Sequence, residues 1–380
     1  MITAQTRLRD FPALASMTYL NTAAEGIPPR CVGEALQEYW QDKLKGMKGR
    51  DDHFVRFDEC REIAARMIHL TPAEVSFCSC SSEACNLLAS ALDLKANDEV
   101  VVNELEYPSS VTPWLTSAAP TRLRIWEARD RELSIDDLRW LLNRRTRLVA
   151  VSLVSFYNGH RVEWKSLAET VHGQAPNAIL SVDVTQALGR CLFDCTDADF
   201  IFSSTHKWTL GIHGGCIVGI PVKAAELLTT RAGGWYHIVN AFGADRFQRA
   251  VLKKGAASFS VGMPSFAPIY ALNASLRYLD SIGIEKIVQQ ADPLVEQLQQ
   301  GLTGLGLKPL APLSGSGIVA FQHAESAKIH AALQRENIHV MNPGGRIRVS
   351  LHGYNTVEDV NHLLQALDRC LDQSGLTVRN

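Results

Sequence analysis

The sequence predicts an α/β protein built on a mostly parallel sheet. Short apolar runs at residues 179–182 and 198–202 are rich in Val, Ile and Phe and end in polar residues, which is the pattern of buried strands. Along the chain such runs alternate with segments of helical periodicity, as they do in βαβ units. At 380 residues the chain is too long for one compact core. We therefore expect two unequal domains.

Composition and charge indicate a globular protein with no membrane or nucleic-acid partner. Hydrophobic residues make up 46% of the chain and charged residues 21%, which is typical of globular domains. The formal net charge is -2, and no long block of like charge occurs. No apolar run approaches the roughly 18 residues of a spanning helix, and the amino terminus lacks the apolar core of a signal peptide. We therefore expect a cytoplasmic protein.

The nine cysteines do not have the spacing of a metal site or of a disulfide framework. Cys78 and Cys80 form C-x-C, Cys191 and Cys195 form C-x3-C, and neither pair has a second Cys or His pair at zinc-site spacing. Several cysteines stand in apolar stretches, as small buried hydrophobic residues do. We expect structural thiols and no metal ion.

The amino-terminal part is predicted to hold a short strand and two helices. Residues 18–26 read TYLNTAAEG, a strand followed by small residues that let the backbone approach another group closely. Pro28 and Pro29 then open a helix to about Leu44, because proline at a first-turn position sacrifices no hydrogen bond. The second helix is expected at residues 57–70.

The next segment, SFCSCSSEACNLLASAL, predicts a helix whose start can bind an anion. Its apolar residues recur at the spacing of an amphipathic helix, and Ser81 and Ser82 stand where the N-cap is expected. A helix amino terminus offers free N–H groups and a positive dipole, and the two hydroxyls add donors for a phosphate. The alternative is that Ser82 serves only as a helix cap.

Further strands are expected at 99–103, 123–126, 148–154 and 216–220, with a helix at 135–143. These strands surround the two central runs, which end at Asp183 and just before Lys207. In a parallel α/β sheet, ligands bind beyond the carboxyl ends of the strands. Asp183 and Lys207 are therefore expected to meet in one crevice.

A lysine and a carboxylate in one crevice suit pyridoxal 5'-phosphate. The cofactor's aldehyde needs an amine for a Schiff base, which Lys207 offers, and its ring nitrogen needs an anion, which Asp183 offers. The alternative is an ordinary acidic strand end beside a surface lysine. The motif VDVTQ, with SSTHK placing Lys207 21 residues after Gln186, resembles the cofactor site of the class V aminotransferase and cysteine desulfurase family.

This resemblance implies pyridoxal-phosphate fold type I and further cofactor contacts. In relatives, the residue at Gln186 hydrogen-bonds the cofactor's phenolic oxygen. The phosphate would be held by residues at the positions of relatives' phosphate contacts: Ser81, Ser82, Ser204 and His206. Tyr107, in ELEYP, stands where desulfurases have the first His of EHH, which stacks on the pyridine ring. A tyrosine stacks equally well but titrates near 10, so it carries protons poorly at neutral pH.

The same resemblance implies a substrate site. RVSLHGYNT is similar to the desulfurase motif RASLAMYNT, whose arginine grips the substrate carboxylate, and Arg348 is that residue by position. The segment containing Ala24 lies beside the substrate in relatives. One residue of SFYNGHR is expected near the cofactor or the substrate, and Ser155, Tyr157 and Asn158 all stay candidates.

A smaller α+β domain is predicted after residue 263. It would contain helices at 269–281 and 287–302, strands near 318–322, 338–341 and 346–351, and a closing helix with Asn355 and Glu358 at capping-box spacing. In the predicted strand at 346–351, Arg346, Arg348 and Ser350 share one face. We expect an arm at 1–17, a large cofactor-binding domain at 18–263 with a seven-stranded type of sheet, and the small domain at 264–380.

The resemblance further implies a homodimer with sites at its interface. FSVGMPSF is similar to the family's AGTPN turn, whose Thr reaches the partner's cofactor phosphate. Met263 takes the Thr position here, so either Ser265 replaces the hydroxyl or the contact is absent.

We expect an enzyme acting on the amino group of a small amino acid through Lys207. Desulfurases carry a nucleophilic Cys shortly before the clamp arginine, and residues 317–350 contain no cysteine, which argues against that activity. Transamination is the first choice, and β-elimination at a C–S or C–Se bond or epimerisation is the alternative. A catalytically silent scaffold is the alternative from another class.

Overall fold

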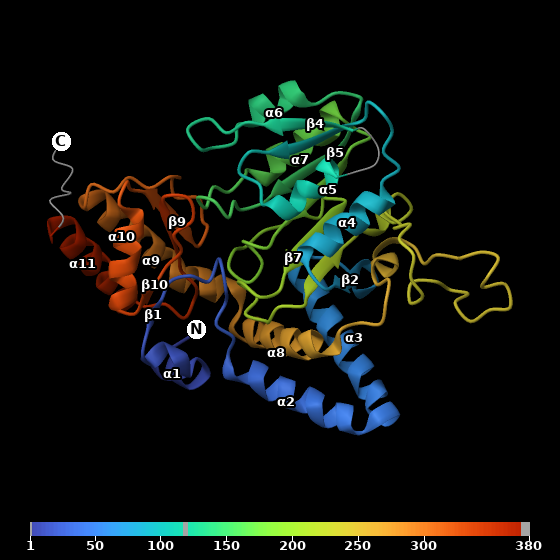
Figure 1. Cartoon of the computed structure of the whole chain (residues 1–380), viewed down its shortest axis with the longest axis horizontal. Helices are drawn as coiled ribbons and strands as arrows, with labels where there is room; N and C mark the ends of the chain where they lie inside the picture. Colours follow the sequence, from blue (N-terminus) through green and yellow to red (C-terminus); the bar gives the residue numbers. More distant parts are fainter. Residues whose placement is uncertain (1, 117–120, 374–380) are drawn as a thin grey trace.

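The computed structural model describes residues 2–116 and 121–373. Its main feature is a seven-stranded sheet with the strand order β2-β8-β7-β6-β5-β3-β4 (Figure 1). β8 runs antiparallel to both neighbours, and the other four strand pairs are parallel. The prediction of a mostly parallel sheet is confirmed. The strands are β2 Val75–Cys78, β3 Glu99–Asn103, β4 Arg122–Trp126, β5 Thr146–Ser152, β6 Ile179–Asp183, β7 Phe200–Ser204 and β8 Cys216–Gly219.

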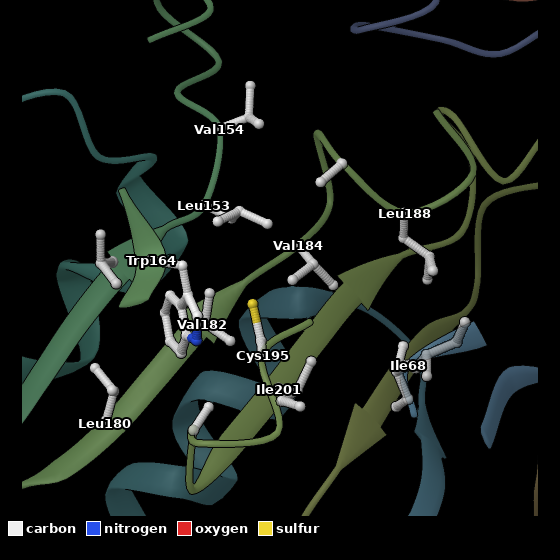
Figure 2. Close-up of a cluster of buried hydrophobic side chains, with 14 of the residues drawn as sticks. Ile68, Leu153, Val154, Trp164, Leu180, Val182, Val184, Leu188, Cys195 and Ile201 are labelled. Carbon is white, nitrogen blue, oxygen red and sulfur yellow. The ribbon is translucent and has the colours of Figure 1, made fainter. Parts of the chain in front are cut away.

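Both faces of this sheet are covered, which explains why its strands are continuous apolar runs. Successive side chains point to opposite faces, so Val101 packs in one core while Val100 and Val102 pack in the other. Figure 2 shows the first core, where Val182 and Ile201 of the sheet lie near Trp164 and Ile68. The helices of this part of the chain are α2 Arg30–Leu44, α3 Gly49–Met67, α4 Ser81–Ala91, α5 Thr112–Leu115, α6 Ile135–Leu141, α7 Trp164–Gln174 and α8 Phe266–Ile282.

The carboxy-terminal part has its own core and two short sheets. β9 Ile318–Gln322 pairs antiparallel with β11 Arg346–Ser350, and β10 Ile338–His339 pairs parallel with β1 Thr18–Tyr19. Apolar side chains of α9, α10 and α11 pack on these strands. The remaining helices are α1 Ala4–Asp10, α9 Ile284–Gly304, α10 Ser326–Arg335 and α11 Val357–Gln373, and 3-10 turns lie at Pro12–Ala15, Gly46–Lys48, Pro72–Glu74, Pro108–Ser110, Val222–Ala224 and Gly255–Phe259.

The domain boundary at residue 264 stays a prediction. α8 contributes Ile269, Leu272 and Leu276 to the core under the large sheet. The separate carboxy-terminal core contains side chains of α9, beginning with Leu294. Within the described residues, no helix combines the length and the hydropathy that crossing a bilayer requires.

Three expected details of the elements are wrong. α3 begins at Gly49 rather than at residue 57, because its first turn is polar and gives no apolar periodicity to mark the start. The N-cap of α4 is Cys80, so Ser81 and Ser82 are the first two helical residues. The capping box before α11 joins Thr356 to Asp359, each side chain accepting the other's backbone N–H, one residue beyond the expected pair.

Candidate active site

A cavity of about 370 Å³ lies where the carboxyl ends of β6 and β7 face the start of α4. This is the edge at which a parallel sheet binds its ligands. The cavity brings together most of the residues that the sequence singles out. Those lining it are Ala24, Ser81, Ser82, Tyr107, Asp183, Gln186, Ser204, His206, Lys207 and Arg348.

Asp183 is fixed at the end of β6 by a local turn. Its Oδ1 accepts the backbone N–H of Thr185 at 2.7 Å, and the Thr185 hydroxyl accepts the N–H of Ser204 at 2.9 Å. These two bonds tie the ends of β6 and β7 together. Burial raises the pKa of the Asp183 carboxyl, although the hydrogen bonds from Thr185 oppose that rise. A cation or an N–H donor in the cavity would favour the charged carboxylate.

Lys207 follows the end of β7 and reaches into the same cavity. Its Nζ lies 5.2 Å from the centroid of the Tyr107 ring. Burial lowers the pKa of Lys207 to about 8, with Arg348 adding to the effect and Asp183 opposing it. Lys207 is therefore an amine that loses its proton close to neutral pH, as a nucleophile or a base must.

Gln186 is oriented by two buried hydrogen bonds. The indole N–H of Trp208 donates to Gln186 Oε1 at 2.6 Å, and Gln186 Nε2 donates to the carbonyl of Ala23 at 3.1 Å. These partners fix which end of the amide is nitrogen. One N–H of Gln186 is left for a ligand, because the amide nitrogen carries two hydrogens.

Trp208 is itself held from the carboxy-terminal part of the chain. The ring of His352 stacks on Trp208, with centroids 5.9 Å apart, and its Nε2 lies 3.2 Å from the Trp208 carbonyl. His352 Nδ1 accepts the N–H of Gly353, so Nε2 carries the hydrogen. Burial lowers the pKa of His352 to about 3, which keeps the ring neutral.

Arg348 is a buried cation with an unused donor. Its Nη1 donates to the carbonyl of Phe156 at 2.8 Å, while its buried Nε has no hydrogen-bond partner among the described residues. Burial, together with the nearby Arg346, lowers the pKa of Arg348 to about 10. An unsatisfied guanidinium donor at a cavity wall is suited to a carboxylate ligand. All five residues of β11 are buried, and Arg348 is the residue of its polar face that lines the cavity.

The start of α4 supplies donors at the other side of the cavity. Ser81 and Ser82 line it, and the first intrahelical bond runs from Ala84 N–H to the Cys80 carbonyl. The N–H groups of the first three helical residues therefore have no partner within the helix. The Ser79 N–H and hydroxyl are occupied by the Glu83 carboxylate, at 2.5 and 2.6 Å.

The three candidates in SFYNGHR lie outside the cavity lining. Asn158 holds its own loop, because Nδ2 donates to the Arg131 carbonyl at 2.8 Å and Oδ1 accepts the His160 N–H at 2.9 Å. The Ser155 hydroxyl donates to the Leu105 carbonyl, and Tyr157 stacks under the Arg346 guanidinium at 3.8 Å. Their neighbour Phe156 is the residue of this loop that reaches the cavity.

Met263 and Ser265 do not line the cavity either. The Met263 sulfur lies 3.9 Å from Arg50 Nη2, and Ser265 precedes α8 as its N-cap residue.

Glu106 is a buried acid that the sequence analysis missed. Its carboxylate accepts the backbone N–H and the hydroxyl of Ser152, the Asn103 amide at 2.8 Å and the Tyr107 N–H at 3.0 Å. Burial raises the pKa of Glu106 to about 7, and the nearby Asp183 adds to this rise. The available signal was its place directly before Tyr107, where it matches the Glu of EHH.

His213 is a second residue that was missed. Its ring stacks on His206 with centroids 3.9 Å apart, and its Nε2 lies 2.9 Å from the Glu25 carboxylate. Ligand atoms of these three residues lie within 4.8 Å of one another. The two rings are only 20° from parallel, so their lone pairs do not converge on one ion. Burial lowers the pKa of His206 to about 4, with Lys207 adding to the effect, so this ring is a neutral donor or acceptor.

Known proteins share both this sequence pattern and this fold. The family model described as aminotransferase class-V matches residues 18–363. The chain belongs to the aminotransferase class-V family. An uncharacterized aminotransferase of Bacillus subtilis is 24% identical over 94% of this chain and 95% of its own.

Several solved structures match the fold over nearly the whole chain. A cysteine desulfurase from Thermococcus onnurineus superposes with a TM-score of 0.88 at 24% identity, covering 98% of this chain and 99% of its own. A cystine C–S lyase gives 0.86 at 21% identity, covering 94% and 99%. A variant of that lyase has been solved with glycine linked covalently to its pyridoxal phosphate. The resemblance drawn from the sequence and the fold type it implied are confirmed.

Proposed function

We propose that this protein binds pyridoxal 5'-phosphate through Lys207 and acts on the amino group of an α-amino acid, as a transaminase in the first instance. The observation that carries the proposal is the convergence of Lys207, Asp183, Gln186 and Arg348 on one cavity. A scaffold protein has no use for an amine of lowered pKa beside an unsatisfied buried guanidinium.

The residues present fit the cofactor. Lys207 would hold its aldehyde carbon, Asp183 its ring nitrogen and Gln186 its phenolic oxygen. Tyr107, whose ring lies beside Lys207, would stack on the pyridine ring of the cofactor. The free N–H groups at the start of α4 suit a phosphate, and the hydroxyls of Ser81, Ser82 and Ser204 and the neutral ring of His206 add donors. When bound, pyridoxal phosphate supplies an electron sink that makes the bonds at the α-carbon of an amino acid labile.

Three residues of the chain would then do the remaining work. Arg348 holds the substrate carboxylate and thereby fixes the orientation of the α-carbon. Lys207 would take the proton from the α-carbon at Nζ, which its lowered pKa permits near neutral pH. Asp183 would keep the ring nitrogen of the cofactor protonated.

A C–S β-lyase is the second candidate. The fold match to a cystine C–S lyase favours it, and so does the lack of a cysteine at residues 317–350, where desulfurases carry their nucleophile. Within the described residues, the cysteine that lines the cavity is Cys80, which precedes α4 and not the strand of Arg348. Elimination needs the same Lys207 base but no keto-acid acceptor.

Product analysis separates these activities. The protein, loaded with pyridoxal phosphate, is incubated with single amino acids in the presence and absence of a keto-acid acceptor. Keto acid that forms only with the acceptor supports transamination. Pyruvate with sulfide from cysteine or cystine, formed without the acceptor, supports the lyase, and racemised amino acid supports epimerisation. If no amino acid gives a product and Lys207→Ala behaves in the same way, the catalytically silent scaffold is the hypothesis that remains.

We further propose a homodimer. The loop at residues 231–254, drawn in yellow in Figure 1, extends away from the body of the molecule. It exposes several large apolar side chains, with Phe242 83% and Phe247 86% exposed. Such a concentration is unusual on a monomer surface. A second copy of the chain is the partner that the family resemblance implies.

A further inference from the structure

The wall of the cavity beside Arg348 is apolar. Tyr107, Phe156, Met341 and Pro343 line the same cavity as the arginine. We infer that the substrate is an amino acid with an uncharged side chain, which lies against Met341. This inference rests on the proposed function only for the α-amino group. The preference for a carboxylate whose distal end is uncharged follows from the pocket itself.

Backbone hydrogen bonds place Met341 next to Arg348, the residue proposed to hold the substrate carboxylate. The Met341 N–H donates to the Arg348 carbonyl at 3.0 Å, and the Arg348 N–H donates to the Met341 carbonyl at 2.8 Å. This exchange defines an antiparallel hydrogen-bonded pair, whose side chains stand about 5 Å apart on one face. Met341 and Arg348 therefore line the cavity from neighbouring positions, so Met341 can contact the side chain of a substrate whose carboxylate Arg348 holds.

The rest of this wall is aromatic. The Phe156 carbonyl accepts Nη1 of Arg348, so the Phe156 backbone touches the clamp directly. Its ring meets Tyr107 edge to face, with centroids 5.0 Å apart and an interplanar angle of 88°. Tyr107 also lies beside Lys207. Aromatic rings therefore extend from the clamp toward the amine that would carry out the chemistry.

The charges around the cavity leave no partner for a charged substrate side chain. Among its lining residues in the described part of the chain, Asp183 is the acid, and it belongs to the strand end that would hold the cofactor. The lining cations Lys207 and Arg348 would hold the cofactor and the substrate carboxylate. Outside the lining, Glu25 is paired with His213, the Glu106 carboxylate accepts hydrogen bonds from Ser152, Asn103 and Tyr107, and Arg346 is stacked on Tyr157. A charged side chain against this apolar wall would lose part of its water without gaining an ion-pair partner, so both acidic and basic side chains are disfavoured.

The volume of the cavity favours a small substrate side chain. About 370 Å³ is near the lower end of the roughly 300–1,000 Å³ found for ligand pockets. The cofactor and the amino acid must share this space. A small aliphatic, thiol or thioether side chain fits these conditions.

Binding of unreactive carboxylates tests this inference without turnover. Butanoate, butanedioate and 4-(trimethylammonio)butanoate share a carboxylate and differ in the charge of the distal end, and none carries an amine that reacts with the cofactor. Dissociation constants are measured by calorimetry on the full-length protein loaded with pyridoxal phosphate. We expect butanoate to bind at least about tenfold more tightly than either charged probe, since tenfold corresponds to one decade in Kd.

Met341→Glu should remove this preference and favour the trimethylammonium probe. Met341 is 38% exposed, so its replacement leaves no buried cavity, and circular dichroism checks the fold. Met341→Gln, which adds polarity without charge, should weaken butanoate binding without favouring the cation. Met47→Glu, at a methionine 73% exposed and outside the cavity, is the matched control and should change nothing.

Three results would overturn the inference: equal or tighter binding of butanedioate, an unchanged order of probes in Met341→Glu, or no binding of any probe. Failure of the proposed function is distinguishable from these. If the protein does not take up pyridoxal phosphate, the proposed function fails. The same three probes on the cofactor-free protein still decide whether the pocket prefers a carboxylate whose distal end is uncharged.

Discussion

The surroundings of Lys207 lower the pKa of its amine. Burial and the neighbouring Arg348 lower its pKa, whereas Asp183 acts in the opposite direction. Below the pKa the ammonium has no lone pair to attack the cofactor's aldehyde. The rate at which the cofactor-free protein captures pyridoxal phosphate should therefore rise with pH up to about 8 and be level above it. Stopped-flow visible absorbance measures this rate, and a rise that continues to about pH 10, the usual pKa of lysine, would show that burial has no such effect.

Arg348 should determine how efficiently amino acids are used. Charge-assisted hydrogen bonds contribute about 1.5–3 kcal/mol each, so Arg348→Ala should lose about tenfold to a hundredfold in kcat/KM. Arg348→Lys should recover only part of the loss, because an ammonium keeps the charge without the planar fork. Arg277→Ala on α8, whose side chain is 62% exposed, is the control. Near wild-type efficiency in Arg348→Ala would place the carboxylate clamp elsewhere.

At the scale of elements, the sequence predicts where the apolar pattern is strong. The bounds of β3 and β9 agree with prediction to the residue, since both are short apolar runs with clear ends. The start of α3 was missed because Asp51 and Asp52, which favour a helix amino terminus, carry no apolar periodicity. The capping box of α11 was displaced by one residue, because Asn355, which was expected as the cap, instead uses its Oδ1 to accept the His352 N–H.

Trp208 joins Gln186 of the cavity to His352 of the carboxy-terminal part, and its bond to Gln186 can be tested. Trp208→Phe removes the donor to Gln186 Oε1 and leaves the amide free to rotate. We expect the dissociation constant for pyridoxal phosphate to rise roughly fivefold, which corresponds to about 1 kcal/mol for one hydrogen bond. When Gln186 is already replaced by Ala, Trp208→Phe should change this dissociation constant little further. A packing defect would instead weaken binding equally in both backgrounds. Trp140→Phe, at an 87% exposed tryptophan, is the control, and equal losses in both backgrounds would contradict the link.

At the scale of the whole molecule, site residues that stand in a family motif could be predicted from the sequence. Site residues that reach the cavity only through tertiary contacts could not. Lys207 and Asp183 stand at the ends of neighbouring strands, so topology alone brings them together. Met341 reaches the cavity because the turn before β11 pairs it with Arg348, and His213 because the chain after Lys207 turns back on His206. Neither pairing leaves a periodic signal in the sequence.

The proposed dimer makes a prediction at the same scale. Replacing Phe242 and Phe247 together by Ser should shift the protein from dimer to monomer, since both side chains are more than 80% exposed in the single chain. Light scattering coupled to size-exclusion chromatography measures the mass. A wild-type mass of one chain, 41.9 kDa, would contradict the dimer, and an unchanged dimer in the double variant would place the interface elsewhere.

Reductive trapping tests most directly whether this cavity holds the cofactor through Lys207. The protein is incubated with pyridoxal phosphate, reduced with borohydride, digested and mapped by mass spectrometry. We expect the phosphopyridoxyl mass on Lys207, no trapped cofactor in Lys207→Ala, and normal trapping in Lys165→Ala, at an exposed lysine on α7. Trapping on a different lysine, or equal trapping in Lys207→Ala, would contradict the proposal.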